Sequence, residues 1–205
     1  MNVIVNHIQK GANRPGRKLS ALRAIVVHYT QNDSPYADAE MNVRWIGRDF
    51  VLKDGKKYEA DGRTPFRFGS AHIFCDMEKV IEAIPTDEVA WAVGDRNYKG
   101  GYQRIAEKAF KRKQNYETIS VEICNNDAIP DSDEDWRLAV ENAKNWIINF
   151  MNEYNLQLAF TESLYPQTVT ELPKGQILLL SHYDLTGKIC PEPFVDNQKH
   201  WDQFI

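Results

Sequence analysis

Two strongly apolar segments that each end in a histidine constrain this chain more than any other feature of its sequence. The first is Ala-Ile-Val-Val-His at 24–28, and the second is Gln-Ile-Leu-Leu-Leu-Ser-His at 176–182. Such runs of branched apolar residues are typical of buried strands. In α/β sheets, ligands and catalytic groups usually lie at the carboxyl ends of the strands. We therefore expect His28 and His182 at one edge of a buried sheet.

The remaining segments alternate between expected strands and helices, which predicts a central mixed β-sheet flanked by helices. No repeat, low-complexity linker or domain boundary interrupts residues 1–205, so we expect one α/β domain. A helix is expected within Ser34–Asp49, with Ser34 as its N-cap and Pro35 in its first turn. Further strands are expected at 71–76, 79–84 and 118–124.

The clearest helix is expected from Asp133 to about Tyr154. Its apolar residues recur at helical spacing and predict one inward-facing stripe. Capping oxygens at 131–133 favour a helix start there. The stripe consists of Trp136, Val140, Ala143, Ile147, Phe150 and Tyr154.

Composition excludes several classes of function. A net charge of −4 gives no overall positive field for nucleic acid or an anionic membrane, and no segment has the apolar length to span a bilayer. The first ten residues lack the pattern of a signal peptide. Three cysteines cannot all pair with one another, so we expect a chain that folds in a reducing cytosol, with a thiol free to bind metal. Nothing in the pattern indicates an oligomeric state.

His28, His182 and Cys190 form a candidate metal site. Cys190 follows His182 by eight residues across a Thr-Gly turn, so the thiolate and the imidazole can reach one ion. Two imidazoles and one thiolate leave the fourth tetrahedral position open, which is the arrangement of catalytic zinc. Each residue alone has a plainer interpretation, because strand-end histidines and buried cysteines are usually part of the core.

Glu122 and Lys188 are candidate catalytic residues. Glu122 shares a strand face with Ser120 and Cys124, opposite the apolar face of the 118–124 segment. It is either a general base with a raised pKa, or one half of a salt bridge, or a side chain that faces solvent. Lys188, two residues before Cys190, either stabilises an oxyanion or is a solvated lysine.

Six sequence blocks, in this order, resemble a known family. They are Asn13–Lys18, Ile25–Thr30, Ser70–Asp76, Val89–Asp95, Ile119–Cys124 and Ser181–Pro191, the last of which contains His-Tyr-Asp-Leu-Thr-Gly-Lys-Ile-Cys-Pro. Together they look like the N-acetylmuramoyl-L-alanine amidases of the superfamily of phage lysozymes and peptidoglycan recognition proteins. The resemblance covers about residues 13–195 and is strongest to endolysins and autolysins of Gram-positive bacteria and their phages.

The resemblance implies roles for individual residues. His28, His182 and Cys190 match the zinc ligands, and Glu122 matches a carboxylate that some branches use as general base. Lys188 matches the basic residue that stabilises the oxyanion. His72 matches a histidine near the site that is not a ligand, and we assign it to substrate binding.

The chain also departs from the family pattern. Relatives often have a histidine after the tryptophan of the Val-Ala-Trp block, where this chain has Ala92. Segments 52–69 and 101–116 look longer than in the compact family core, which implies a remodelled substrate groove. We expect three arginines of these segments to meet stem-peptide carboxylates. They are Arg63, Arg67 and Arg104.

The resemblance implies a zinc-dependent enzyme that cuts the amide bond between N-acetylmuramic acid and L-alanine in peptidoglycan. Because no signal peptide is expected, the protein would be made in the cytoplasm and reach the cell wall by another route: holin-type release, cell lysis, or as a fragment of a larger protein. One alternative is a binding module without activity, although Cys190, Glu122 and Lys188 argue against it. Another is an amidase that acts on soluble muropeptides during wall recycling.

Overall fold

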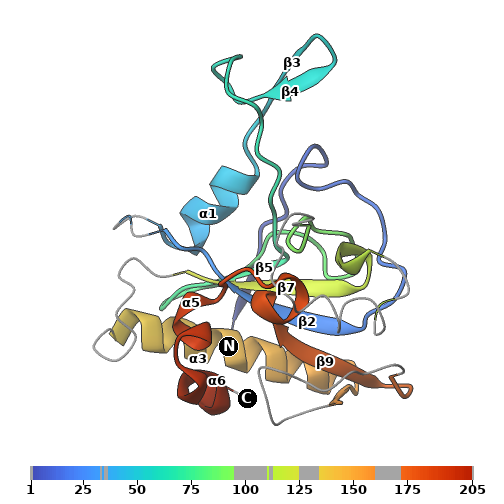
Figure 1. The fold of residues 1–205 in the computed structure, drawn as a ribbon, viewed down its shortest axis with the longest axis vertical. Helices are drawn as coiled ribbons and strands as arrows, with labels where there is room; N and C mark the ends of the chain where they lie inside the picture. Colours follow the sequence, from blue (N-terminus) through green and yellow to red (C-terminus); the bar gives the residue numbers. More distant parts are fainter. Residues whose placement is uncertain are drawn as a thin grey trace.

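The central feature of the computed structural model is a mixed sheet, which the described residues form from seven strands (Figure 1). The structure describes residues 2–32, 34, 37–94, 110, 113–124, 134–159 and 172–204. All neighbouring strands are parallel except β5 and β6, which are antiparallel. In sheet order the strands are β1 (Val3–Val5), β6 (Val80–Glu82), β5 (Ile73–Cys75), β7 (Thr118–Ile123), β2 (Ala24–Tyr29), β9 (Gln176–Ser181) and β8 (Gln157–Leu158).

The helix α3 (Glu134–Glu153) covers one face of this sheet (Figure 1). Alternate residues of the central strands point toward it, including Ile25, Val27 and Val121, which are all fully buried. The predicted inward stripe of α3 is confirmed from Trp136 to Phe150. Tyr154 does not belong to it, because the helix ends at Glu153 and the tyrosine is 55% exposed.

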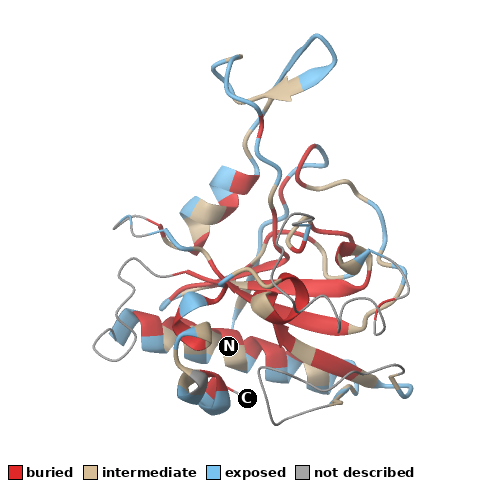
Figure 2. Cartoon of the chain, viewed as in Figure 1, coloured by how far each residue is buried: buried red, intermediate tan, exposed pale blue. Residues whose placement is uncertain are grey.

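The opposite sheet face is covered by two separate helices. Helix α1 (Ala39–Ile46) packs on β5 and β6, and the short helix α4 (His182–Thr186) packs on β2 and β9. The red colour of the central strands in Figure 2 shows that both layers bury the sheet. This arrangement leaves the region above β2 and β7, between α1 and α4, as the place where a site can form.

Helix α1 begins later than the sequence predicts. Its N-cap is Asp38, whose carboxylate accepts a hydrogen bond from the Met41 amide at 2.7 Å. The amide of Ala39 donates to the Asp76 carboxylate at 2.9 Å. These two carboxylates satisfy amides that the first turn cannot pair internally, so they fix the helix start. The expected Ser34 cap is therefore wrong; Pro35 lies outside the described residues.

The segment after α1 leaves the body of the molecule as a small hairpin (Figure 1). Strands β3 (Val51–Lys53) and β4 (Lys56–Tyr58) pair antiparallel and form a sheet of their own. The tight turn between them uses Asp54 and Gly55, both with positive φ. The hairpin corresponds to the first of the two segments that look longer than the family core.

The remaining elements are short. A 3-10 turn, η1 (Gln114–Tyr116), precedes β7, and helices α5 (Glu192–Val195) and α6 (Gln198–Phe204) follow α4. Phe194 and Trp201 of these helices pack into the core cluster beside α3. Within the described part of the chain, every helix is too short or too polar to cross a membrane.

Candidate metal centre and active site

The parallel strands β2 and β9 bring the two predicted histidines together. Ala24 pairs with Leu178 and Val27 with Ser181, so the two strands end at the same edge of the sheet. His28 is the second-last residue of β2, and His182 is the first residue of α4, directly after β9. Both side chains are buried, and their rings lie 4.7 Å apart between centroids.

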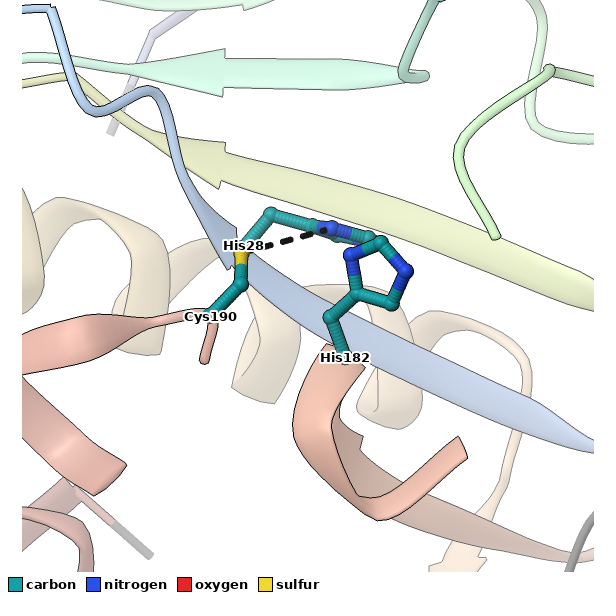
Figure 3. Close-up of side chains that lie close together, drawn as sticks. All are labelled: His28, His182 and Cys190. Carbon is teal, nitrogen blue, oxygen red and sulfur yellow. Dashed lines mark hydrogen bonds between the residues drawn. The ribbon is translucent and has the colours of Figure 1, made fainter. Parts of the chain in front are cut away.

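Cys190 reaches the same point from the loop after α4 (Figure 3). Gly187 ends α4 in a left-handed conformation, with φ of 77°, which lets the chain turn back toward the sheet. The Tyr183 amide donates to the Cys190 carbonyl at 3.0 Å, which ties the loop to α4. The Tyr29 amide donates to the Cys190 sulfur at 3.4 Å, which ties it to β2.

These three side chains form a group that could hold a metal ion. One candidate donor atom from each of His28, His182 and Cys190 lies within 4.8 Å of the others. The Cys190 sulfur is 3.9 Å from Nδ1 of His28. All three side chains are buried. The geometric prediction made from the sequence, that residues 28, 182 and 190 converge, is therefore met.

The electrostatics of the two imidazoles also fit a metal. Burial lowers the pKa of His28 well below its ordinary value, and the nearby His182 and Lys188 lower it further. Burial, together with Lys188, lowers the pKa of His182 to about 3. Both rings are therefore neutral near pH 7, which is the form that binds metal.

Within the part of the chain that the structure describes, several ring nitrogens of the two histidines lack a hydrogen-bond partner, as expected where a metal ion binds. Nε2 of His28 and both ring nitrogens of His182 are buried without a hydrogen-bond partner among the described residues. A buried polar atom without a partner costs free energy, and native structures rarely leave one unexplained. A bound metal would supply a partner for one nitrogen of each ring, which accounts for His28 Nε2 and for one of the two His182 nitrogens, so these residues fit a metal centre.

A capping box holds His182 at the strand-to-helix junction. The Asp184 carboxylate accepts from the Ser181 amide at 2.7 Å and from the Ser181 hydroxyl at 2.8 Å. In return the Asp184 amide donates to the Ser181 hydroxyl at 3.1 Å. The Ser-x-x-Asp pattern at 181–184 is a recognisable sequence signal for such a box. This signal marks Asp184 as a positioning residue, which is absent from the residues predicted above.

Glu122 lies beside His28 on the neighbouring strand β7. The two residues are direct partners in the parallel pairing of β2 and β7. Burial raises the pKa of Glu122 to about 7, and the positive charge of Lys188 acts in the opposite direction. Its Oε2 atom has no hydrogen-bond partner within the described ranges. The salt-bridge alternative finds no support there, because no ion pair of Glu122 occurs among these residues.

A cavity of about 1020 Å³ opens above these residues. Its walls come from α1, the hairpin, the loop before Pro15, and the segments around Trp91 and Asn115. Lys188 lines it as well, half-buried. The described lining includes every predicted metal-site and catalytic residue, namely His28, Glu122, His182, Lys188 and Cys190.

His72 is placed differently from these residues. It is fully buried within the sheet region and is not among the residues that line the cavity. The Ser120 amide donates to its Nδ1 at 3.0 Å, so Nε2 carries the proton and donates to the Glu88 carbonyl at 2.8 Å. Burial lowers its pKa to about 4. Both ring nitrogens of His72 are thus used by backbone groups, which suits a structural role better than a contact with substrate.

Two of the three predicted arginines do not line the cavity. Arg63 and Arg67 have exposed side chains near the hairpin and are absent from the lining. Arg104 lies outside the described residues. The hairpin and its surroundings contribute other side chains to the lining, which the sequence analysis did not single out. They are Trp45, Lys57 and Phe68.

The fold and the site together define an α/β domain with a two-histidine, one-cysteine group, fit for a metal, at the ends of parallel strands. The profile of the N-acetylmuramoyl-L-alanine amidase family matches residues 18–193. This chain therefore belongs to that family.

Individual relatives agree with this assignment. The amidase BlyA of Bacillus subtilis (strain 168) is 30% identical over 196 residues, which cover 93% of this chain and 42% of BlyA. The amidase XlyA of the same strain is 27% identical over 205 residues, which cover this whole chain and 50% of XlyA. The chain thus spans half or less of these relatives. The solved catalytic domain of XlyA superposes with a TM-score of 0.63 at 26% identity, covering 100% of this chain and 99% of that domain.

Proposed function

We propose that this domain is a zinc-dependent amidase that hydrolyses the bond between N-acetylmuramic acid and L-alanine in bacterial peptidoglycan, and that it acts on the cell wall. The observation that carries the proposal is the convergence of His28, His182 and Cys190, with Glu122 beside His28 on the next strand. Such a centre, with three protein ligands, is the usual form of catalytic zinc. Family membership supports the choice of substrate.

His28, His182 and Cys190 would hold the zinc ion. Mixed imidazole and thiolate donors suit zinc better than the oxygen-seeking ions magnesium and calcium. When bound, zinc polarises a substrate carbonyl and lowers the pKa of water to about 7. The chain keeps the ligands in place through the β2–β9 pairing, the capping box and the Tyr29 amide.

Glu122 would act as the general base and acid. Its pKa of about 7 places it between its two protonation states near neutral pH, where proton transfer in both directions is efficient. It would remove the proton from the attacking water and later deliver it to the departing L-alanine nitrogen. Positioned groups of this kind typically contribute about 10²–10⁴-fold to the rate.

Lys188 would stabilise the negative charge that develops on the carbonyl oxygen. It lines the cavity and lies close enough to affect the pKa of both Glu122 and His182. A single donor of this kind is typically worth roughly 3–4 kcal/mol of transition-state stabilisation. The loop that carries Cys190 therefore contributes both a ligand and a charge.

Product analysis on purified sacculi tests the proposal. We expect mass spectrometry to show intact glycan and free stem peptides that begin with L-alanine, and a chelator to abolish their release. Glu122→Gln should keep zinc and lose activity by about 10²-fold or more. Glu78→Gln, which removes an exposed carboxylate away from the cavity, is the matched control and should stay active.

The same assay separates the alternatives. Sacculi bound without any released peptide, by a protein that contains zinc, would indicate a binding module. Cleavage of soluble muropeptides without loss of sacculus turbidity would indicate a recycling enzyme. Full activity of Glu122→Gln would remove this residue from the mechanism.

A further inference from the structure

The cavity extends beyond the metal centre onto the segment 45–68, which we call the arm. The arm includes the last residues of α1, the β3–β4 hairpin and the chain that returns from it. Besides the buried Ile46, three of its side chains line the same cavity as the metal site, although no sequence motif marks them. These three, which we call the arm subsite, are Trp45, Lys57 and Phe68.

Arg48 fixes the base of the arm. Its guanidinium lies 3.7 Å from the ring centroid of Trp45 and 4.7 Å from that of Phe66. Two hydrogen bonds of 2.8 Å join it to the Glu59 carboxylate after β4. Arginine stacked on rings and paired with a carboxylate is well suited to lock a planar arrangement. The indole of Trp45 is therefore held in place before any ligand arrives.

Among the residues that the structure describes, no carboxylate lies within ion-pairing distance of the positively charged Lys57. Its ammonium lies 4.4 Å from the ring centroid of Phe50 and 5.5 Å from that of Phe68. Within the described residues it takes part in no ion pair. Lys57 lines the cavity, and the aromatic rings do not cancel its charge, so the ammonium is available to an anionic ligand.

Trp45 and Phe68 expose large aromatic surfaces in the same cavity. Trp45 is 50% exposed and Phe68 is 58% exposed. Exposed aromatic side chains that line a concave site commonly mark a binding surface. The electron-rich face of an aromatic ring attracts the weakly positive C–H groups on the flat side of a sugar ring. Aromatic rings next to a free cation therefore suit a saccharide that carries a carboxylate.

We propose that Trp45, Lys57 and Phe68 bind a second disaccharide-peptide unit of the glycan strand, next to the unit that is cleaved. Its sugar rings would stack on Trp45 and Phe68, and a carboxylate of its peptide would pair with Lys57. This inference rests on the proposed function, because it assumes that the cleaved unit occupies the metal centre. The arm thereby selects polymeric peptidoglycan over fragments with a single sugar.

Binding is tested first, in the Glu122→Gln background so that the polymer is not consumed. Trp45→Ala and Phe68→Ala should each weaken cosedimentation with purified sacculi about tenfold, as truncation of an aromatic anchor typically does. Lys57→Met should weaken it less and remove part of its salt dependence. Leu52→Ala is the matched control, because Leu52 is 64% exposed on the same hairpin but does not line the cavity.

Kinetics in the active protein provide the second readout. The arm variants should raise KM for sacculi, while turnover of a muramoyl peptide with one sugar stays unchanged. Equal losses on both substrates would show a structural effect and overturn the proposal. If Trp45→Ala fails to fold, Phe68→Ala carries the same expectation, since its ring is the more exposed of the two.

The outcomes separate the subsite from the proposed function. If the protein releases stem peptides but the arm variants bind sacculi as tightly as Leu52→Ala does, the subsite is wrong and the amidase proposal stands. If no amide is cleaved but only the arm variants lose binding, the subsite stands and the amidase proposal fails.

Discussion

The metal centre and the arm are positioned by opposite means. His28 is 2% exposed, and its strand β2 pairs in parallel with β7 on one side and with β9 on the other. Trp45 is 50% exposed, and its place depends on the stacked guanidinium of Arg48. The sheet therefore orients two of the groups proposed to perform chemistry, His28 and Glu122, whereas a few local contacts orient those proposed to select the substrate.

This contrast agrees with a general division in α/β proteins. A rigid scaffold holds reacting groups to within a fraction of an ångström, and loops between the scaffold elements carry specificity. Changes at the metal centre should therefore remove activity entirely, while changes in the arm should alter which substrates are used.

The largest effect is expected from Cys190→Ser. Loss of the thiolate should release most of the zinc and lower activity roughly 100-fold or more, because the metal then lacks its softest ligand. Elemental analysis after dialysis measures the zinc directly. Cys124→Ala removes another buried thiol and should keep its zinc. Full zinc content in Cys190→Ser would exclude the sulfur as a ligand.

His72→Ala should lower stability more than catalysis. The substitution leaves the Ser120 amide and the Glu88 carbonyl without their partner in a fully buried place. We expect a loss of about 2–4 kcal/mol in the free energy of unfolding, measured by denaturant titration. A normal unfolding curve with a raised KM would instead support the substrate contact that the family resemblance suggests.

Asp184→Ala should lower stability less than His72→Ala does, but it should also weaken zinc binding. Without its carboxylate, the Ser181 amide and hydroxyl lose their shared acceptor at the start of α4. We expect a loss of about 1–2 kcal/mol in stability and weaker zinc retention, because His182 is no longer held at the junction. Asp184→Asn keeps one acceptor oxygen and should recover part of both. Unchanged zinc affinity in the alanine variant would limit Asp184 to a role in stability.

The smallest effect is expected from Glu59→Gln and should be confined to the arm. The hydrogen bonds from Arg48, followed by that from the Arg67 amide, lower the pKa of Glu59 to about 2, below its ordinary 4.5. Its ion pair with Arg48 therefore contributes fully to stability above about pH 4.5, and this contribution is lost as the pH falls toward 2. Amide hydrogen exchange in β3 and β4 should become faster in the variant at neutral pH and unchanged in β2 and β7. Equal rates in the arm would show that the stacking of Arg48 suffices.

The sequence predicted the parts of the fold that have strong local patterns. The β2, β7 and β9 segments are apolar enough to be recognised as buried strands, and the period of α3 identified its inward face. The edge strands β1 and β8, with three and two residues, are too short for such a pattern to identify them. Strand order depends on pairings between distant segments, which local periodicity does not encode.

The site was predictable to a similar extent. Histidines at strand ends and a cysteine after a Gly turn can be recognised in the sequence, and the structure brings them together. The true start of α1 was missed, although its N-cap Asp38 is a local signal; only the second carboxylate, Asp76, lies far along the chain. The proposed arm subsite has no sequence signal, because Trp45, Lys57 and Phe68 are far apart in the chain and line one cavity only when the hairpin folds back.

The parallel register of β2 and β7 has a consequence for how this enzyme family can change. His28 and Glu122 face each other across one rung of a backbone ladder, so loops can lengthen or shorten without altering the gap between them. A single residue inserted within β7, however, would turn Glu122 toward α3 and bring an aliphatic side chain into the cavity. Variation in this domain should therefore accumulate in its loops, while the number of residues within each central strand stays constant.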